Sequence, residues 1–167
     1  MRTGLLFFIG GLVHILPETR CFTLKRFLFR ICGVQVGANV RICSSVKILG
    51  NGPLIIGENT WIGHETMIVC SSRVDIGKNV NIAPRCYIGT GTHDISFNGN
   101  SVAGRGVSSP IAIGDGSWLC THSIILAGSH IGSKAIIAAG AVVKGDVLDF
   151  ELVGGVPAKH IKDLQIQ

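Results

Sequence analysis

Aromatic and charged residues are scarce in this sequence. Phenylalanine, tryptophan and tyrosine make up 6% of the 167 residues and charged residues 15%, whereas 47% are hydrophobic. A nucleic-acid-binding chain needs a concentrated basic face with aromatic side chains for stacking, and the net charge of +5 is not gathered in that way. We therefore expect no nucleic-acid partner, and a core of stacked aliphatic side chains with many tight glycine corners.

Cysteine pairs at metal-binding or redox spacing are also missing. The six cysteines include no CxxC motif, and they are too few for a disulfide framework in a chain of this length. Free cysteines usually behave as small buried hydrophobic residues in a reducing compartment. The sequence thus predicts free thiols, most of them buried, and a cytoplasmic protein.

No hydrophobic run is long enough to span a bilayer. Residues 4–16 are apolar over only 13 positions, where a spanning helix needs about 20, and they lack the cleavage site of a signal peptide. After Pro17, apolar residues fall at helical spacing among basic ones: Leu24, Phe27, Leu28 and Ile31. Such a helix can lie on an anionic membrane or cover an open end of the core, so peripheral membrane association through residues 1–30 stays open.

A six-residue repeat is the strongest feature that the sequence does contain. A small or medium-sized residue stands four positions after each repeated aliphatic residue, and the position directly after that aliphatic residue is often glycine. A strict six-residue period does not fit an α-helix, but it fits short strands joined by tight corners. Three repeats make one triangular coil, so fifteen predict an all-β solenoid of about five coils. The repeated residues are Val36, Ile42, Ile48, Ile56, Ile62, Ile68, Ile76, Ile82, Ile88, Ile113, Leu119, Ile125, Ile131, Ile137 and Val143.

The repeat is interrupted once, between Ile88 and Ile113. These residues are 25 positions apart, which is one six-residue step and 19 additional residues. The inserted segment is polar and rich in glycine and serine, and His93 and Asp94 stand where it begins. We therefore expect one loop, at about residues 93–111, that extends from the solenoid.

These features resemble the hexapeptide-repeat acyltransferases, whose fold is a left-handed parallel β-helix. The likeness covers about residues 34–162, and "PIAIGDGSWLCTHSIILAGSHIGSKAIIAAGAVV" from Pro110 looks like the late coils of that family. "GTHD" before the loop and "GGVPAKHIK" from Gly154 look like the sugar O-acetyltransferase branch. The expected parts are an apolar and basic helical segment (1–33), the β-helix domain with its loop (34–162), and a short C-terminal tail or helix (163–167).

The resemblance implies an acetyl-CoA-dependent O-acetyltransferase that acts on a saccharide, most plausibly in surface-polysaccharide synthesis. It implies a homotrimer that binds acetyl-CoA in the groove between neighbouring β-helices, with the loop of one subunit reaching across that groove. It implies no metal requirement. The expected location is the cytoplasm, with the inner face of the cell membrane as an alternative.

The resemblance also assigns roles at the acceptor end of the site. His93 matches the general base, because a neutral imidazole with a pKa near the operating pH suits removal of a hydroxyl proton. Asp94 either orients that imidazole or only turns the loop. Gly63 and His64 stand where relatives carry an acceptor-binding Asn, so they are candidates for substrate binding and leave the sugar unidentified.

The coenzyme end of the site is assigned in the same way. Trp118 matches a tryptophan that packs against the acetyl-pantetheine end, and the backbone amides of Thr121 and Ala139 match positions that contact CoA. Positive charge for the CoA phosphates would come from the late lysines. These lysines are Lys144, Lys159 and Lys162.

Three other functions use the same kind of fold. An amino-sugar N-acetyltransferase is the nearest enzymatic alternative, although such enzymes typically carry an N-terminal nucleotide-binding domain that does not fit here. A non-catalytic β-helix scaffold is a second. A γ-type carbonic anhydrase would need convergent zinc-binding histidines, and His64, His93 and His122 lack the closely spaced pair of that family.

Overall fold

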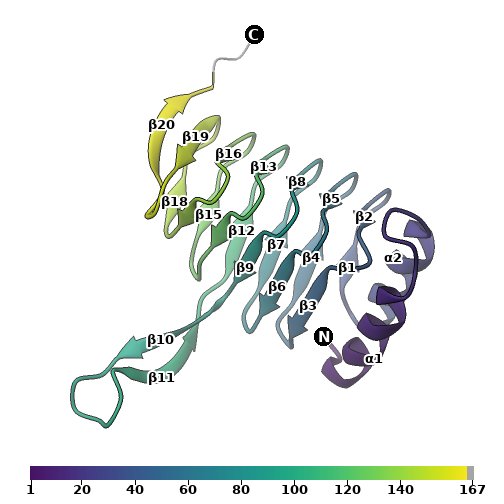
Figure 1. Ribbon diagram of the computed structural model, residues 1–167, viewed down its shortest axis with the longest axis horizontal. Coiled ribbons are helices and arrows are strands. Elements are labelled where there is room, and N and C mark those ends of the chain that lie inside the picture. Colours follow the sequence, from purple (N-terminus) through teal and green to yellow (C-terminus); the bar gives the residue numbers. More distant parts are fainter. Residues whose placement is uncertain (165–167) are drawn as a thin grey trace.

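The computed structural model describes residues 1–164 and consists of two helices, a solenoid of short parallel strands, and one projecting hairpin (Figure 1). The helices are α1 (Thr3–His14) and α2 (Phe22–Ile31), and they lie side by side at the N-terminal end of the solenoid. The strands form three sheets that are the three flat sides of the solenoid. Neither helix has the length and apolarity that crossing a bilayer requires.

The chain visits the three sheets in turn, once per coil. Sheet A contains β1 (Gln35–Val36), β4 (Leu54–Ile56), β7 (Val74–Ile76), β12 (Ile111–Ile113), β15 (His130–Ile131) and β18 (Asp146–Val147). Sheet B contains β2 (Arg41–Ile42), β5 (Trp61–Ile62), β8 (Asn81–Ile82), β13 (Trp118–Leu119), β16 (Ile136–Ile137), β19 (Glu151–Gly154) and β20 (Lys159–Asp163). Sheet C contains β3 (Lys47–Gly50), β6 (Met67–Cys70), β9 (Tyr87–Gly89), β14 (Ile124–Ile125) and β17 (Val142–Val143).

The predicted repeat forms the core. All fifteen repeated aliphatic residues are buried, and none is more than 7% exposed. They stack in exact columns because each strand pairs in register with the strand one coil away, as Ile42 does with Ile62 and Ile62 with Ile82. The polar residues that also point inward, such as Thr60 and Ser117, hydrogen-bond to backbone carbonyls at the corners. The predicted all-β stack of coils is thus confirmed.

The stack is slightly longer than the fifteen repeats predict. Five complete coils are followed by a sixth that has only β18 in sheet A and β19 in sheet B. At the end of the segment expected to belong to the β-helix domain, β20 folds back antiparallel on β19, with Leu152 opposite Lys162, and it reaches Asp163, the first residue of the predicted tail. The reversal occupies a β19 edge that no further coil would cover. Of the predicted tail, residues 165–167 lie outside the described residues.

At the other end, α2 lies across the open edge of the first coil. The Arg26 guanidinium donates a hydrogen bond to the carbonyl of Val40 (3.1 Å), and Arg30 Nε donates to the carbonyl of Val36 (2.9 Å). Lys25 is fully buried, and its Nζ donates to the Pro17 carbonyl (3.0 Å) and the Glu18 carbonyl (2.7 Å). The sequence left two roles open for this helix, lying on a membrane and covering the end of the core. The contacts of α2 within the chain are those of a helix that covers the end of the core.

Candidate active site

The hairpin leaves the solenoid at the corner between sheet C and sheet A. It consists of β10 (Gly91–Ile95) and β11 (Ala103–Ser108), so the insertion predicted as a loop is largely a two-stranded ribbon (Figure 1). Thr90, at its root, is fully buried, and its Oγ1 accepts hydrogen bonds from the N–H groups of Ser71 (2.8 Å) and Ser72 (2.9 Å). Thr92 stands four positions after Ile88, where the repeat predicts an inward side chain. It is exposed on β10, and Thr90 points inward instead.

His93 lies on β10, opposite Gly106 of β11, and its side chain is exposed. Its Nδ1–H donates a hydrogen bond to the carbonyl oxygen of Gly104 (2.9 Å). That bond selects the tautomer in which Nε2 carries no proton and can accept one. The imidazole borders a cavity of about 430 Å³ at the base of the hairpin. The cavity is lined by Ser71, Gly91, Thr92, His93, Gly106, Val107 and Ser108.

The imidazole is oriented by a backbone carbonyl, and not by the neighbouring carboxylate. The Asp94 carboxylate is exposed and lies 3.9 Å from Nε of Arg105. Gly104 is missed by the sequence reasoning, although a close approach requires glycine there: a Cβ would lie 2.9 Å from the Asp94 carbonyl oxygen. Only the pairing of the two hairpin strands reveals this partner, eleven residues from His93.

A second group of predicted residues follows the corner between sheets B and C. Thr121 and Ala139 occupy this corner in successive coils, where the Gly140 N–H donates to the Thr121 carbonyl (3.0 Å). Thr121 Oγ1 also donates to the Pro84 carbonyl, one coil toward the N-terminus (2.8 Å). His64 continues the same column, since its carbonyl accepts from the Arg85 N–H (2.8 Å). These residues share one edge of the solenoid.

Trp118 lies on the outer face of sheet B and is half exposed. In the register of that sheet it pairs with Ile136, which pairs with Leu152, which is opposite Lys162 of β20. The structure thus brings Lys162 into one row with Trp118. Lys159 also lies on β20, whereas Lys144 follows β17 in sheet C, and all three lysines are exposed.

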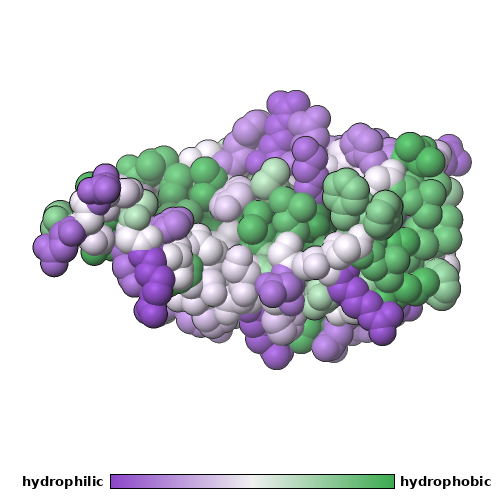
Figure 2. All heavy atoms as spheres, turned by 90° about the horizontal axis from the view of Figure 1, so that it is seen from below, coloured by the Kyte–Doolittle hydropathy of each residue, from purple (hydrophilic) through white to green (hydrophobic). Residues whose placement is uncertain are grey.

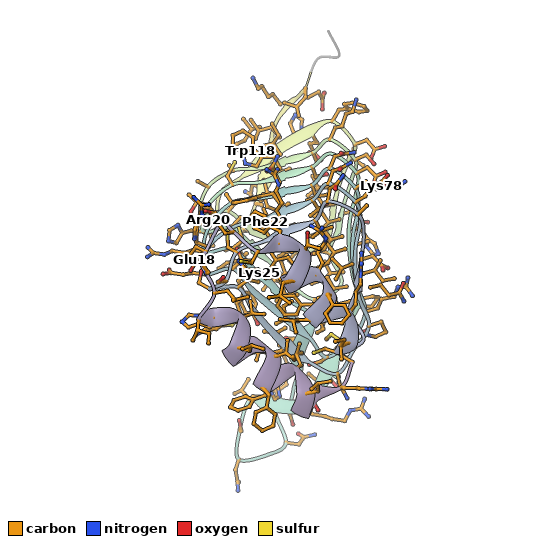
Figure 3. The ribbon with its side chains drawn as sticks, turned by 90° about the vertical axis from the view of Figure 1, so that its right-hand side faces the viewer. Glu18, Arg20, Phe22, Lys25, Lys78 and Trp118 are labelled. Atoms are coloured by element: carbon orange, nitrogen blue, oxygen red, sulfur yellow. The ribbon has the colours of Figure 1, made fainter. Side chains whose placement is uncertain are left out.

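His64 has a partner that the sequence did not reveal. Its Nδ1 lies 3.3 Å from Oε2 of Glu18, which comes from the segment between α1 and α2 (Figure 3). Burial opposes the charge of Glu18, but hydrogen bonds from Ser45 and the charge of His64 outweigh it and hold the pKa of Glu18 below its usual value. Gly63 is buried, and a Cβ there would lie 2.8 Å from the Pro84 nitrogen, so close packing explains this glycine.

Glu18 and His64 also approach Cys43, with one donor atom of each residue within 4.8 Å of the others. These residue types bind metals, but the environment here suits a cation poorly. Burial raises the pKa of the Cys43 thiol to about 11, so it stays protonated at neutral pH. The ammonium of Lys25 adds a positive charge that interacts with both Glu18 and Cys43. We interpret the cluster as an ion pair that joins the helical segment to the solenoid.

Within one chain, the two groups of predicted residues lie on different edges. His93 belongs to the corner between sheets C and A, whereas Trp118 and Thr121 belong to sheet B and the corner that follows it. Among the described residues, none of the second group lines the cavity beside His93. The described residues of one chain therefore do not bring His93 and Trp118 to one cavity.

Proteins of similar sequence are acetyltransferases. WcaF of Escherichia coli K12, described as a colanic acid biosynthesis acetyltransferase, is 29% identical over 139 residues, which are 83% of this chain and 74% of that protein. The galactoside O-acetyltransferase of the same strain is 30% identical over 129 residues, which are 77% of this chain and 63% of that protein. This chain therefore spans less than two thirds of the second relative. No protein-family model matches the chain.

Solved structures agree on the fold. A hexapeptide-repeat acetyltransferase from Vibrio cholerae superposes with a TM-score of 0.82 at 22% identity, over 98% of this chain and 91% of that one. The same Vibrio protein in complex with acetyl coenzyme A gives a TM-score of 0.72. The predicted left-handed β-helix is thus confirmed, as is the resemblance that the repeats suggested.

Proposed function

Because this chain is a homologue of sugar O-acetyltransferases and has the fold of the hexapeptide-repeat acetyltransferases, we propose that it transfers an acetyl group from acetyl-CoA to a saccharide hydroxyl. The relative described for colanic acid biosynthesis favours an acceptor that belongs to a surface polysaccharide. The observation that carries the proposal is the state of His93. Its Nδ1–H is bound by the Gly104 carbonyl, and its Nε2 is free beside a 430 Å³ cavity.

In the proposed reaction, Nε2 of His93 takes the proton from the acceptor hydroxyl while the hydroxyl oxygen attacks the thioester carbonyl. The C–S bond then breaks, and the imidazolium returns the proton to the leaving CoA thiolate. The Gly104 carbonyl stabilises the imidazolium that forms between these steps, because it accepts from Nδ1–H in both charge states. No metal takes part in this scheme, and Asp94 acts only in shaping the hairpin.

We propose that the working unit is a homotrimer in which sheet C contacts a neighbouring chain. Apart from Lys47 in β3, the outward positions of sheet C are apolar, which is unusual for a face left in water. They are Leu49, Met67, Val69, Tyr87, Ile124 and Val142. Side-by-side packing would place the His93 hairpin of one chain against the sheet B edge of another, where Trp118, Thr121 and Ala139 are the proposed acetyl-CoA contacts. Lys144, Lys159 and Lys162 are the proposed phosphate contacts.

The direct test is His93→Ala, assayed by CoA release from acetyl-CoA with a panel of free glycosides, nucleotide sugars and lipid-linked oligosaccharides. We expect turnover to fall about 10²- to 10⁴-fold with acetyl-CoA binding retained in calorimetry, because only the proton transfer is lost. His130→Ala is the matched control, since His130 is an exposed histidine on sheet A that pairs with Asp146 (3.1 Å).

Three results would contradict the proposal. Near-full turnover by His93→Ala would remove the general base. Transfer only to the amines of amino-sugar nucleotides would identify an N-acetyltransferase, and acetyl-CoA binding without any turnover would identify a scaffold. We also propose a cytoplasmic location at the inner face of the membrane, with peripheral association through residues 1–30.

A further inference from the structure

Seven large apolar side chains point into solvent from the two N-terminal helices. In α1 the buried side holds Leu6 and Val13, and in α2 it holds Leu28 and Phe29, so each helix has packed its apolar side and still exposes a second one. The most exposed are Phe7 (78%), Ile15 directly after α1 (77%), Phe8 (73%) and Phe27 (58%). Together, the exposed residues define the apolar cap surface: Phe7, Phe8, Leu12, Ile15, Leu24, Phe27 and Ile31. Figure 2 shows hydrophobic residues gathered over this end of the molecule.

The position of α2 excludes a neighbouring subunit as the cover for its part of this surface. α2 lies across the first coil, because its Arg26 and Arg30 bind carbonyls at the edge of that coil. The row of Leu24, Phe27 and Ile31 is on the side of the helix opposite buried Phe29, so it faces away from the coils. Chains packed by their flat sides run side by side and leave these ends uncovered.

The charge of the segment fits an anionic surface. Residues 1–33 contain five Lys and Arg and a single acidic residue, Glu18, so they account for four of the five net positive charges of the chain. Lys25 is buried, so the cations left toward solvent are Arg2, Arg20, Arg26 and Arg30. Arg30 is exposed and Arg26 is half-buried, and both keep their charge at the rim of the apolar cap surface while binding backbone carbonyls. Figure 3, which faces the two helices, places Arg20 at the same end. Apolar side chains ringed by cations are typical of helices that lie in a membrane interface.

An apolar groove joins the apolar cap surface to sheet C. It lies between α1 and β3 and has a volume of about 440 Å³. Gly10 and Gly11 line it, and a Cβ at either position would have no atom within 4 Å, so the groove has open space along α1. The other lining residues are Leu6, Phe7, Phe8, His14, Phe29, Val46, Lys47, Ile48 and Leu49. A lipid chain that follows the inserted phenylalanines into this groove would contact apolar atoms along its length.

We propose that the apolar cap surface docks this protein on a bilayer rich in anionic phospholipid, with Phe7, Phe8, Leu24 and Phe27 inserted among the lipid chains. The inference extends the membrane association proposed above by naming the docking surface and the lipid. The docking itself is independent of the enzymatic activity, and only its advantage to the enzyme rests on the proposed function. A membrane-docked trimer meets an acceptor that is carried on a lipid without having to extract it. The solenoid then stands away from the bilayer, and the sheet faces remain free for trimer contacts.

Co-sedimentation of the full chain with vesicles tests the proposal, with vesicles of phosphatidylcholine alone and of phosphatidylcholine and phosphatidylglycerol in equal amounts. We expect binding to the anionic vesicles, weakening at high salt. The double variants Phe7→Ser/Phe8→Ser and Leu24→Ser/Phe27→Ser should each bind the vesicles at least about tenfold more weakly. Each variant loses two apolar side chains that the native chain would bury among the lipids. Leu148→Ser/Val156→Ser is the matched control, since both residues are exposed (71% and 73%) but belong to the last coil and the segment after it.

Three results would overturn the proposal: no binding of the native chain to anionic vesicles, equal binding by the cap variants, or equal loss in the Leu148→Ser/Val156→Ser control. A native mass that rises with concentration and is reduced by the cap variants would assign the surface to a second copy instead. Acetyl transfer to a soluble saccharide, measured in the same variants, is expected to stay unchanged. His93→Ala should bind vesicles normally, so failure of the docking surface and failure of the proposed enzyme are separable.

Discussion

The outer faces of sheet A and sheet C differ sharply, although the two sheets share one core. On the inside both present aliphatic residues of the same repeat, such as Ile56 in sheet A and Ile68 in sheet C. On the outside sheet C is apolar from the second to the fifth coil, with Lys47 beside Leu49 in the first, whereas sheet A is mixed and mostly polar. The outward residues of sheet A are Gln35, Ile55, Asp75, Ala112, His130 and Asp146.

The inward and outward positions of the repeat are thus under different constraints. The inward position must fill the same triangular space in each coil, so its residue type is nearly constant. The outward position is free of that demand, because alternate side chains of a strand point to opposite faces. The outer residues can therefore differ from face to face, as the proposed contact of sheet C with a neighbouring chain would require.

The largest expected effect comes from placing a charge on each face in turn. Val69→Lys puts an ammonium in the middle of the apolar face of sheet C, and we expect the proposed trimer to dissociate because a buried charge without a partner is strongly unfavourable. Ala112→Lys on sheet A should leave the mass unchanged. Light scattering measures the mass of the particle. Acetyl transfer should fall to background in Val69→Lys and stay unchanged in Ala112→Lys. A trimer that survives Val69→Lys would assign the contact to another face.

A smaller effect is expected at the corner where these two sheets meet. Thr90→Val removes the acceptor of the Ser71 and Ser72 N–H groups while keeping the side-chain shape. We expect the free energy of unfolding to fall by about 1–3 kcal/mol, because part-buried donors lose their partner. Thr90→Ser keeps the hydroxyl and is the control. Denaturant titration measures the difference, and a loss in Thr90→Ser without a loss in Thr90→Val would show that the methyl group matters and the hydrogen bonds do not.

The smallest effect concerns the core of the solenoid, where the inward residues of sheets A and C are expected to be equally buried. Burial raises the pKa of the Cys70 thiol, at the end of β6 in sheet C, to about 12, and thiolates are the reactive form. We expect a thiol reagent near neutral pH to label exposed Cys21 first, and Cys70 only after unfolding. Cys21→Ser should abolish the fast phase. Fast labelling that persists in Cys21→Ser would mean that the core is more open than its packing indicates.

The sequence predicts most of the fold because the repeat is local. Each core position can be counted from its neighbours six residues away, and all fifteen are buried where the count places them. Prediction fails where the period stops. Nothing in residues 159–163 signals a reversal, because β20 is determined by the free edge of β19. The root of the hairpin is misplaced by the same cause, since Thr90 departs from the count to reach Ser71 and Ser72.

The candidate site is less accessible to sequence reasoning, because its contacts join distant segments. His93 can be located from its place beside the insertion, but its partner Gly104 depends on how two hairpin strands pair. The contact of Glu18 with His64 joins residues 46 positions apart, through a segment that has no repeat at all. Whether His93 acts with Trp118 depends on a second chain, and no pattern within one chain encodes that geometry.

The α2 helix has a consequence for how this protein behaves at high concentration. A stack of parallel strands exposes at each end a row of carbonyl and amide groups that can pair with the end of another stack, and repeated pairing would build a fibre. Arg26 and Arg30 occupy this row at the first coil, and β20 turns the last coil antiparallel. The sheet A and sheet B edges of the first coil and the β19 edge of the last are thereby occupied, so we expect end-to-end growth through these edges to be disfavoured.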